Sequence, residues 1–389
     1  MPERRTAARL DGIPPTIFST MSALALRTGA VNLGQGFPDE DGPPAVIAAA
    51  VAALEGGANQ YAPGTGVPAL RQAIARHQRR HYGLDLDPDT QVVVTTGCTE
   101  GVAAALLGLV NPGDEVVVLE PYYDSYVAML QMAGGVRRPV TLRAPDFRLD
   151  LDELRAAVTD RARFVLLNSP HNPTGTVLTR DELTAVAELA VEHDLVVITD
   201  EVYEHLTFGA EHVPIATLPG MAERTLSLSS AGKSYSFTGW KVGWATGPAE
   251  LVGALLAAKQ WLTFTSGAPL QPAVAAALDE HPDFPATLAA QLHEKRDLLC
   301  DGLEKIGLRG RPPEGTYFAT SDITELGWPD AMSFCLALPE RAGVVGIPTQ
   351  VFYDDAEAGR QLVRWAFCKR GEVIEEALGR LAAADLRYP

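Results

Sequence analysis

The chain has 389 residues, of which 47% are hydrophobic and 21% are charged, and its formal net charge is −17 at pH 7. This composition excludes a disordered chain and predicts a globular protein that is large enough for two domains. The negative charge argues against a nucleic-acid partner, because binding phosphate backbones requires clustered Lys and Arg.

The first 40 residues show no regular alternation of strand and helix patterns. Pro-rich stretches at Ile13–Pro15 and Gly42–Pro44 indicate turns or linkers. We expect this N-terminal segment to pack against the C-terminal part of the chain.

From residue 41 to residue 270, short β-branched runs alternate with helical patterns such as Thr99–Val110 and Arg180–His193. The predicted strands are Gln91–Thr95, Glu115–Leu119, Arg137–Thr141, Phe164–Asn168, Leu195–Thr199, Thr225–Leu228 and Gly243–Thr246. This alternation is typical of an α/β fold with a mostly parallel sheet. Several strands end in polar or Gly-rich turns, and ligands bind at the carboxyl ends of strands in such sheets. We therefore expect the functional site at these turns.

After residue 270 the pattern changes. Helical segments are predicted at Pro272–Leu278, Ala286–Ile306 and Val373–Ala384, and short strands at Thr316–Ser321, Gly343–Pro348 and Leu362–Phe367. The prediction is an α/β protein whose large domain, residues 41–270, has a mixed, mostly parallel seven-stranded sheet flanked by helices. Residues 1–40 and 271–389 form a smaller α+β domain in this interpretation.

The clearest chemical pattern is the stretch SSAGKSYSFTGWKVGW at residues 229–244. It places Lys233 in a Gly-containing turn directly after a strand, where a lysine amine can form a Schiff base with an aldehyde cofactor. Lys241 and Ser230 are candidates for holding a phosphate of the same cofactor. A nucleotide-binding P-loop is excluded, since that motif needs a glycine where Ser227 stands.

Asp200 ends an apolar strand in the sequence ITDEVY. Pyridoxal phosphate, the usual aldehyde cofactor, draws electrons efficiently only while its ring nitrogen is protonated, which requires a carboxylate partner. A buried carboxylate is costly unless it is hydrogen-bonded or paired, so we expect Asp200 to have such a neighbour. Tyr203, three residues later, is a candidate donor to the phenolate oxygen of the cofactor.

Two further turns supply candidate contacts. In TTGCTEG a helix begins directly after a strand, and free N–H groups at a helix N-terminus bind phosphate well, which makes Gly97, Cys98 and Thr99 candidates. In LNSPHNPTG, the amide of Asn172 is a candidate partner of the phenolate oxygen, and Pro173 is a candidate cis-proline.

Taken together, these segments resemble the class I aminotransferases of the fold-type I pyridoxal-phosphate enzymes. GQGFPD near the start, NQY at residues 59–61 and VRWAFCK near the end resemble the subgroup of kynurenine, glutamine and methionine aminotransferases. NLGQGFPDEDGPP, EPYYDSY, NSPHNPTG and TDEVYEHL are similar to actinobacterial N-succinyldiaminopimelate aminotransferases. Cys98 and Gly232 depart from the alanines that are usual in the family, but both are small.

The resemblance implies further roles. Tyr123 would stack on the cofactor ring, and Tyr61 would reach the phosphate bound by a neighbouring subunit, which implies a homodimer with shared active sites. Arg364 would clamp the substrate α-carboxylate, assisted by Asn168 and the backbone of Gly36. Lys233 would both carry the cofactor and shuttle the proton.

The implied activity is the transfer of an amino group from an L-amino acid to a 2-oxo acid in two half-reactions, with N-succinyl-L,L-diaminopimelate and 2-oxoglutarate as the expected pair and a role in lysine biosynthesis. A kynurenine, glutamine, methionine or aromatic aminotransferase remains an alternative, and so does β-lyase activity on cysteine conjugates. Because few residues precede Asn32, we expect no DNA-binding segment of the kind that a transcription regulator requires. Substrates are therefore expected to be small molecules.

Other patterns carry less weight. His77 and His81 are four residues apart on a predicted helix, but no Glu follows the first of them, and we expect an exposed helix face and no metal site. The four scattered cysteines fit reduced thiols better than a disulfide framework. The N-terminus lacks the apolar core of a signal peptide and no run is long enough to span a membrane, so we expect a cytoplasmic protein.

Overall fold

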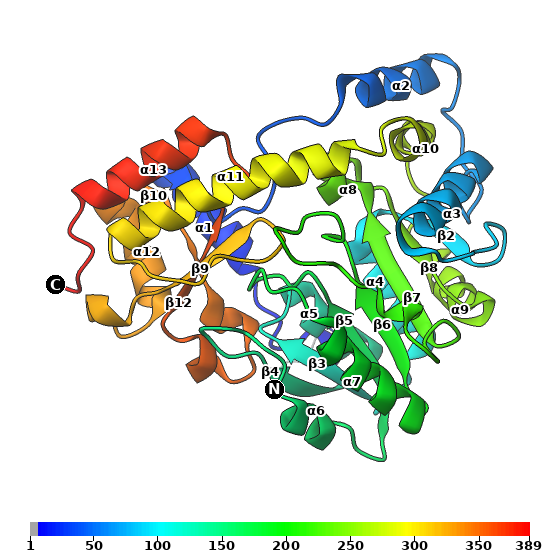
Figure 1. Ribbon diagram of the computed structural model, residues 1–389, viewed down its shortest axis with the longest axis horizontal. Helices are drawn as coiled ribbons and strands as arrows, with labels where there is room; N and C mark the ends of the chain where they lie inside the picture. Colours follow the sequence, from blue (N-terminus) through cyan, green and yellow to red (C-terminus); the bar gives the residue numbers. More distant parts are fainter. Residues whose placement is uncertain (1–6) are drawn as a thin grey trace.

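The computed structural model of the protein describes residues 7–389. Residues 1–6, which the sequence assigns to the small domain, lie outside the described residues. The described chain forms one large sheet with its helices and a second, smaller group of helices and short strands (Figure 1).

A seven-stranded mixed sheet forms the centre of the larger part. Its strands, in spatial order, are β2 (Val92–Thr95), β8 (Gly243–Thr246), β7 (Thr225–Ser230), β6 (Val196–Asp200), β5 (Ala162–Asn168), β3 (Glu115–Glu120) and β4 (Val136–Thr141). Strands from β7 to β4 are parallel, and β8 is antiparallel to both of its neighbours. The seven predicted strands and the predicted fold class are confirmed.

Both faces of this sheet are covered. In β3, Val116 and Val118 pack into one apolar cluster, whereas Val117 and Leu119 pack into another on the opposite face. The first face is covered by α4 (Gly97–Leu109), α5 (Asp124–Ala133) and α9 (Ala249–Lys259), and the second by α6 (Leu151–Ala157) and α7 (Arg180–Glu192). A strand that is buried on both faces reads as a continuous apolar run, which is why these strands are visible in the sequence.

Local signals fix several helix ends. Thr179 and Glu182 form a capping box at the start of α7, which satisfies two backbone N–H groups that have no partner inside the helix. Gly83 ends α3 (Pro68–Tyr82) with a φ of 71°, a left-handed conformation that glycine adopts without strain. Helix α3 packs with α2 (Pro44–Glu55) and α10 (Leu270–Glu280) beside β2 and β8.

The smaller part of the molecule combines both ends of the chain (Figure 1). Its strands are β1 (Val31–Asn32), β9 (Phe318–Asp322), β10 (Val344–Val345), β11 (Ile347–Pro348) and β12 (Leu362–Ala366), and its helices are α1 (Ile17–Thr28), α11 (Phe284–Lys305), α12 (Ala331–Ala342) and α13 (Gly371–Ala383). Strand β1 pairs in parallel with β10, and β12 lies between β11 and β9. The N-terminal segment therefore packs against the C-terminal part, as predicted. It does contain a helix, α1, which the sequence analysis missed along with α12.

The division into domains at residues 40 and 270 stays a prediction. Helix α8 (Ala231–Ser234) follows β7, and short 3₁₀ helices occupy Ala8–Leu10, Ile215–Thr217, Thr238–Trp240, Thr324–Leu326, Thr349–Phe352 and Ala356–Gly359. Among residues 7–389, no helix combines the length and the apolar character that crossing a lipid bilayer would require.

Candidate active site

A cavity of about 300 Å³ lies where several strands of the large sheet end. Strands β5, β6 and β7 contribute their last residues, Asn168, Asp200 and Ser230, as expected for ligand sites in such sheets. Phe318 and Arg364 reach the same cavity from β9 and β12. The cavity is therefore formed jointly by the large sheet and the smaller part of the molecule.

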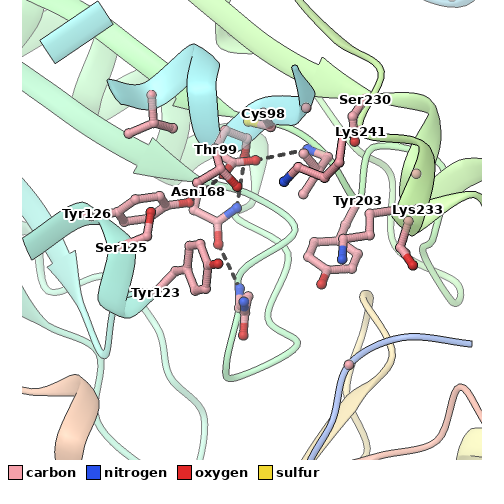
Figure 2. A pocket seen from close by; sticks show the side chains of 18 of the residues that line it. Cys98, Thr99, Tyr123, Ser125, Tyr126, Asn168, Tyr203, Ser230, Lys233 and Lys241 are labelled. Carbon is pink, nitrogen blue, oxygen red and sulfur yellow. Dashed lines mark hydrogen bonds between the residues drawn. The ribbon is translucent and has the colours of Figure 1, made fainter. Parts of the chain in front are cut away.

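The sequence-predicted site residues meet in this cavity, with one exception (Figure 2). Those that line it are Gly36, Gly97, Cys98, Thr99, Tyr123, Asn168, Asn172, Asp200, Tyr203, Ser230, Lys233, Lys241 and Arg364. The exception is Tyr61, whose side chain is 84% exposed to solvent. This position leaves Tyr61 free to contact a second chain, but that role stays a prediction.

The Lys233 amine lies between the large sheet and the smaller part of the molecule. Its Nζ donates a hydrogen bond of 2.9 Å to the hydroxyl of Tyr317, which in turn donates to the backbone oxygen of Gly36. Burial lowers the pKa of Lys233 from 10.5 to about 8. At pH 7 a lysine with this pKa is mostly protonated, and roughly a tenth of it has the neutral form that acts as a nucleophile or base.

Asp200 is a buried carboxylate with neutral partners. Its Oδ2 accepts a hydrogen bond of 2.7 Å from the Tyr126 hydroxyl, and its Oδ1 accepts one of 3.2 Å from the backbone N–H of Val202. The predicted hydrogen-bonded neighbour is confirmed. Burial nevertheless raises the pKa of Asp200, because no cation within residues 7–389 pairs with it directly. A protonated ring nitrogen facing Asp200 would supply the missing positive charge.

A candidate phosphate-binding site lies at the start of α4. Its first residues, Gly97, Cys98 and Thr99, face the cavity together with Ser230 and Lys241. Gly97 has a φ of 71°, and a Cβ there would lie 3.2 Å from Nζ of Lys241. That amine has no hydrogen-bond or ion-pair partner among the described residues. A free cation beside a helix N-terminus is the arrangement that binds phosphate.

Arg364 is 1% exposed, and its guanidinium lies 3.9 Å from the centre of the Phe318 ring and 4.9 Å from that of Phe18. Nη1 donates to Oδ1 of Asn172 over 3.0 Å, and Nη2 donates to the backbone oxygen of Gly34 over 2.9 Å. Its Nε is buried without a partner in the described structure. Burial lowers the pKa of Arg364 to about 10, so the group stays charged at neutral pH. A carboxylate ligand would meet both the unpaired charge and the unpaired donor.

Asn168 connects the end of β6 to the loop that follows β5. Its amide donates to the backbone oxygen of Asp200 over 2.8 Å, and its side-chain oxygen accepts the backbone N–H of Asn172 over 2.8 Å (Figure 2). The Asn172–Pro173 peptide bond is cis, as predicted. The side-chain oxygen of Asn172 faces Arg364, so the proposed contact of Asn172 with the phenolate oxygen stays a prediction, as does that of Tyr203.

Some side chains differ from expectation. Tyr317 contacts Lys233 and Phe18 contacts Arg364. Neither was anticipated, because Tyr317, directly before β9, and Phe18, in α1, are far from their partners in sequence. Two other aromatic side chains point elsewhere: Trp261 is 83% exposed, and the hydroxyl of Tyr122 donates to Asp354. These two residues are not part of the cavity lining.

The described donor set fits pyridoxal phosphate. The cavity offers an amine for an aldehyde, a free cation with a helix N-terminus for a phosphate, and a buried carboxylate without a cation for a ring nitrogen. The buried Nε of Arg364, which has no hydrogen-bond partner in the described structure, fits the carboxylate of an amino acid.

A profile of the family described as aminotransferase class I and II matches residues 28–381. The chain is 54% identical to a protein of Mycobacterium tuberculosis named "Probable N-succinyldiaminopimelate aminotransferase DapC", over 97% of this chain and 98% of that protein. It is 40% identical to the methionine aminotransferase of Escherichia coli over 96% of this chain and 97% of that protein. It is 36% identical to a kynurenine–oxoglutarate transaminase of Dictyostelium discoideum over 93% of this chain and 92% of that protein. The solved structure of the Mycobacterium tuberculosis N-succinyldiaminopimelate aminotransferase has a TM-score of 0.95, covering 97% of this chain and 99% of that chain.

Proposed function

The chain belongs to the class I and II aminotransferases, which makes it a pyridoxal-phosphate-dependent transaminase, and from this premise we propose that it transfers the amino group of N-succinyl-L,L-diaminopimelate to 2-oxoglutarate. The observation that carries the proposal is the 54% identity, over 97% of the chain, to a protein named for that substrate. We place this reaction in lysine biosynthesis.

The cavity residues divide the work of holding the cofactor. Lys241, Ser230 and the start of α4 would hold the phosphate, and Tyr123 would stack on the ring. Tyr203 and Asn172 would bind the phenolate oxygen. Asp200 would keep the ring nitrogen protonated, since its own burial favours a positive partner.

When bound, pyridoxal phosphate supplies an aldehyde that takes up the amino group and a ring that withdraws electrons from the α-carbon. Lys233 accepts the α-proton at its Nζ and later donates a proton from the same atom. A pKa of about 8 suits both steps, because the amine can be neutral before the transfer and protonated after it. Tyr317 orients this amine through the hydrogen bond of 2.9 Å to Nζ.

Arg364 would bind the α-carboxylate. Phe18 and Phe318 hold the guanidinium plane by stacking, and Gly34 and Asn172 hold two of its nitrogens. The planar fork is thus fixed before the substrate arrives, which reduces the entropy lost on binding. Gly36 and Asn168 would assist Arg364 in binding the α-carboxylate.

The distal part of a long substrate requires additional space and charge. A second cavity of about 250 Å³ also borders Lys233 and is lined by Lys295, Gln291 and Glu40. Lys295 forms an ion pair with Glu40 at this site. We assign the distal carboxylates of the succinylated substrate to this cavity, where Lys295 would exchange its ion pair with Glu40 for one with the substrate.

We also propose a homodimer with shared sites. Tyr61 and Phe264 form an edge-to-face pair with centroids 5.4 Å apart, and Tyr61, Phe264 and Trp261 are 84%, 53% and 83% exposed. Such a group of exposed aromatic rings is typical of an interface. Mixing Lys233→Ala with Tyr61→Ala subunits tests the sharing. Each mixed dimer would contain one intact site of two, and an equimolar mixture, in which about half of the dimers are mixed, would regain about a quarter of wild-type activity. Failure of the mixture to regain activity, with mixed dimers demonstrated, would contradict a shared site.

A panel of amino donors with 2-oxoglutarate as acceptor tests the substrate. We expect the highest kcat/KM with N-succinyl-L,L-diaminopimelate, and Lys233→Ala should abolish turnover with every donor. A higher kcat/KM with methionine, glutamine or kynurenine would replace the proposed substrate while leaving the transaminase intact. The rings of Phe18, Phe318 and Tyr123 in the cavity favour this second candidate. Release of pyruvate and a thiol from cysteine conjugates, faster than oxo-acid-dependent turnover, would instead indicate a β-lyase.

A further inference from the structure

Three histidine rings meet outside the active-site cavity, where α3 approaches the segment that follows β6. His77 and His81 are one turn apart on α3, and His205 comes from the segment between β6 and β7. Nε2 of His77 and Nε2 of His205 are 2.7 Å apart, and one ring nitrogen of each histidine lies within 4.8 Å of the other two. The ring centroids are separated by 4.6, 4.8 and 4.9 Å, so the rings form a nearly equilateral group.

These separations suit a common ligand. Zinc–imidazole bonds are about 2.0–2.1 Å long, so two nitrogens on one tetrahedral ion lie about 3.3 Å apart. The nitrogen of His77 lies 2.7 Å from that of His205, and no two of the three ligand atoms are more than 4.8 Å apart, so the separations in the cluster lie close to this value. We propose that His77, His81 and His205 bind one divalent transition-metal ion such as Zn²⁺, with water completing the coordination.

The surroundings provide charge, support and access. The carboxylate of Glu204, which is 4% exposed, is held by the hydroxyls of Tyr82 and Ser229 and adds a buried negative charge next to His205 in the chain. The amide of Gln78 lies 3.4 Å from Nδ1 of His77. With its amide rotated by half a turn, Gln78 presents the oxygen that the second ring nitrogen of a metal-bound histidine requires.

The three histidines differ in their exposure to solvent. His77 is 2% exposed, His205 is half-buried and His81 is exposed. An ion can therefore arrive from solvent through His81 and be held against the inner two rings. The ion would join α3 to the segment that carries Asp200 and Tyr203, so its binding should stabilise the folded chain.

Equilibrium dialysis of the chelator-treated holoenzyme against ZnCl₂, with the bound metal counted per chain, tests the proposal. We expect one zinc ion per chain, a rise in Tm with zinc concentration, and no comparable effect of Mg²⁺ or Ca²⁺, which prefer oxygen ligands. His81→Gln changes an exposed ligand and should weaken zinc binding by at least about 10-fold. His205→Gln removes a second ligand independently and should do the same.

His193→Gln is the matched control, because His193 is exposed at the end of α7 and away from the cluster. It should bind zinc as the wild type does. Absence of zinc uptake by the wild type, or equal uptake by wild type and His81→Gln, overturns the proposal; the latter outcome would place the ion on the cysteines or the cofactor instead.

Discussion

Replacing Asp200 with asparagine is the sharpest test of how this active site works. The two side chains have the same shape, and the asparagine oxygen can still accept the Val202 N–H that Asp200 accepts over 3.2 Å. What changes is the charge. Since Asp200 has only neutral hydrogen-bond partners among residues 7–389, the protonated ring nitrogen of the cofactor is the cation that would lose its counter-ion.

The size of the effect follows from burial. Removing one partner of a buried ion pair costs about 3–5 kcal/mol, and a factor of ten corresponds to about 1.4 kcal/mol. We expect the half-reaction with an amino donor to slow by roughly 10²- to 10⁴-fold. Stopped-flow absorbance of the bound cofactor, recorded after its content has been measured, separates a slower step from a loss of cofactor.

The adjacent Glu201 provides a matched control. Its side chain is also buried, at 3% exposure, but it faces His212 at 3.9 Å rather than the cavity. Glu201→Gln makes the same change of charge next to Asp200 and should leave the rate close to that of the wild type. Because burial raises the pKa of Asp200, the neutral asparagine should not lower the Tm of the cofactor-free protein. A loss of less than about 10-fold in Asp200→Asn would refute the assigned role.

Three further predictions concern the cations of the site. Arg364→Lys keeps the charge but loses the planar guanidinium and its stacking on Phe318, so KM for amino donors should rise about 10- to 100-fold. An equal rise in KM for amines that lack a carboxylate would contradict the assigned role. Lys233 has a pKa of about 8 in the folded chain and 10.5 otherwise, so the unfolded state binds more protons between these values. As pH rises from 8 to 10.5, the free energy of unfolding of the cofactor-free wild type should therefore increase relative to that of Lys233→Met, by at most about 3 kcal/mol, as measured by denaturant unfolding. The same dependence of this free energy on pH in both proteins would exclude the lowered pKa of Lys233. Lys295→Gln should lower kcat/KM for the succinylated donor about 2- to 5-fold and leave methionine unaffected; an equal loss for both donors would remove Lys295 from substrate recognition.

The large sheet was predictable because its strands carry their own pattern. Runs such as Val116–Leu119 are buried on both faces and end in polar turns, so their position is visible without tertiary information. Helix α1 was missed because the Pro-rich sequence before it obscured a helix that begins at Ile17 and is capped by the side chain of Thr16. The spatial order of the strands in the sheet could not be predicted, because no local sequence pattern indicates which strands lie side by side.

The site was predictable where a single residue performs chemistry that few others can perform. Lys233 and Asp200 are such residues, and the cavity contains both. Tyr317 differs, because its importance lies in a hydrogen bond to a lysine 84 residues earlier in the chain. A tyrosine in the turn before a short strand has no feature in its local sequence that indicates this partner.

His77 shows that one part of the missing information was present in the sequence. The buried residues of α3 include Leu70, Ile74 and His77, which follow one another at spacings of four and three and therefore share one helix face. The charged residues beside His77 favoured an exposed face, and for His77 that prediction was wrong, whereas His81 is exposed. A histidine on the apolar stripe points inward, and the next one on that stripe emerges where the helix leaves the core. Periodicity alone therefore placed both rings on one helix face, whereas the exposure of His81 and the position of His205 required the fold.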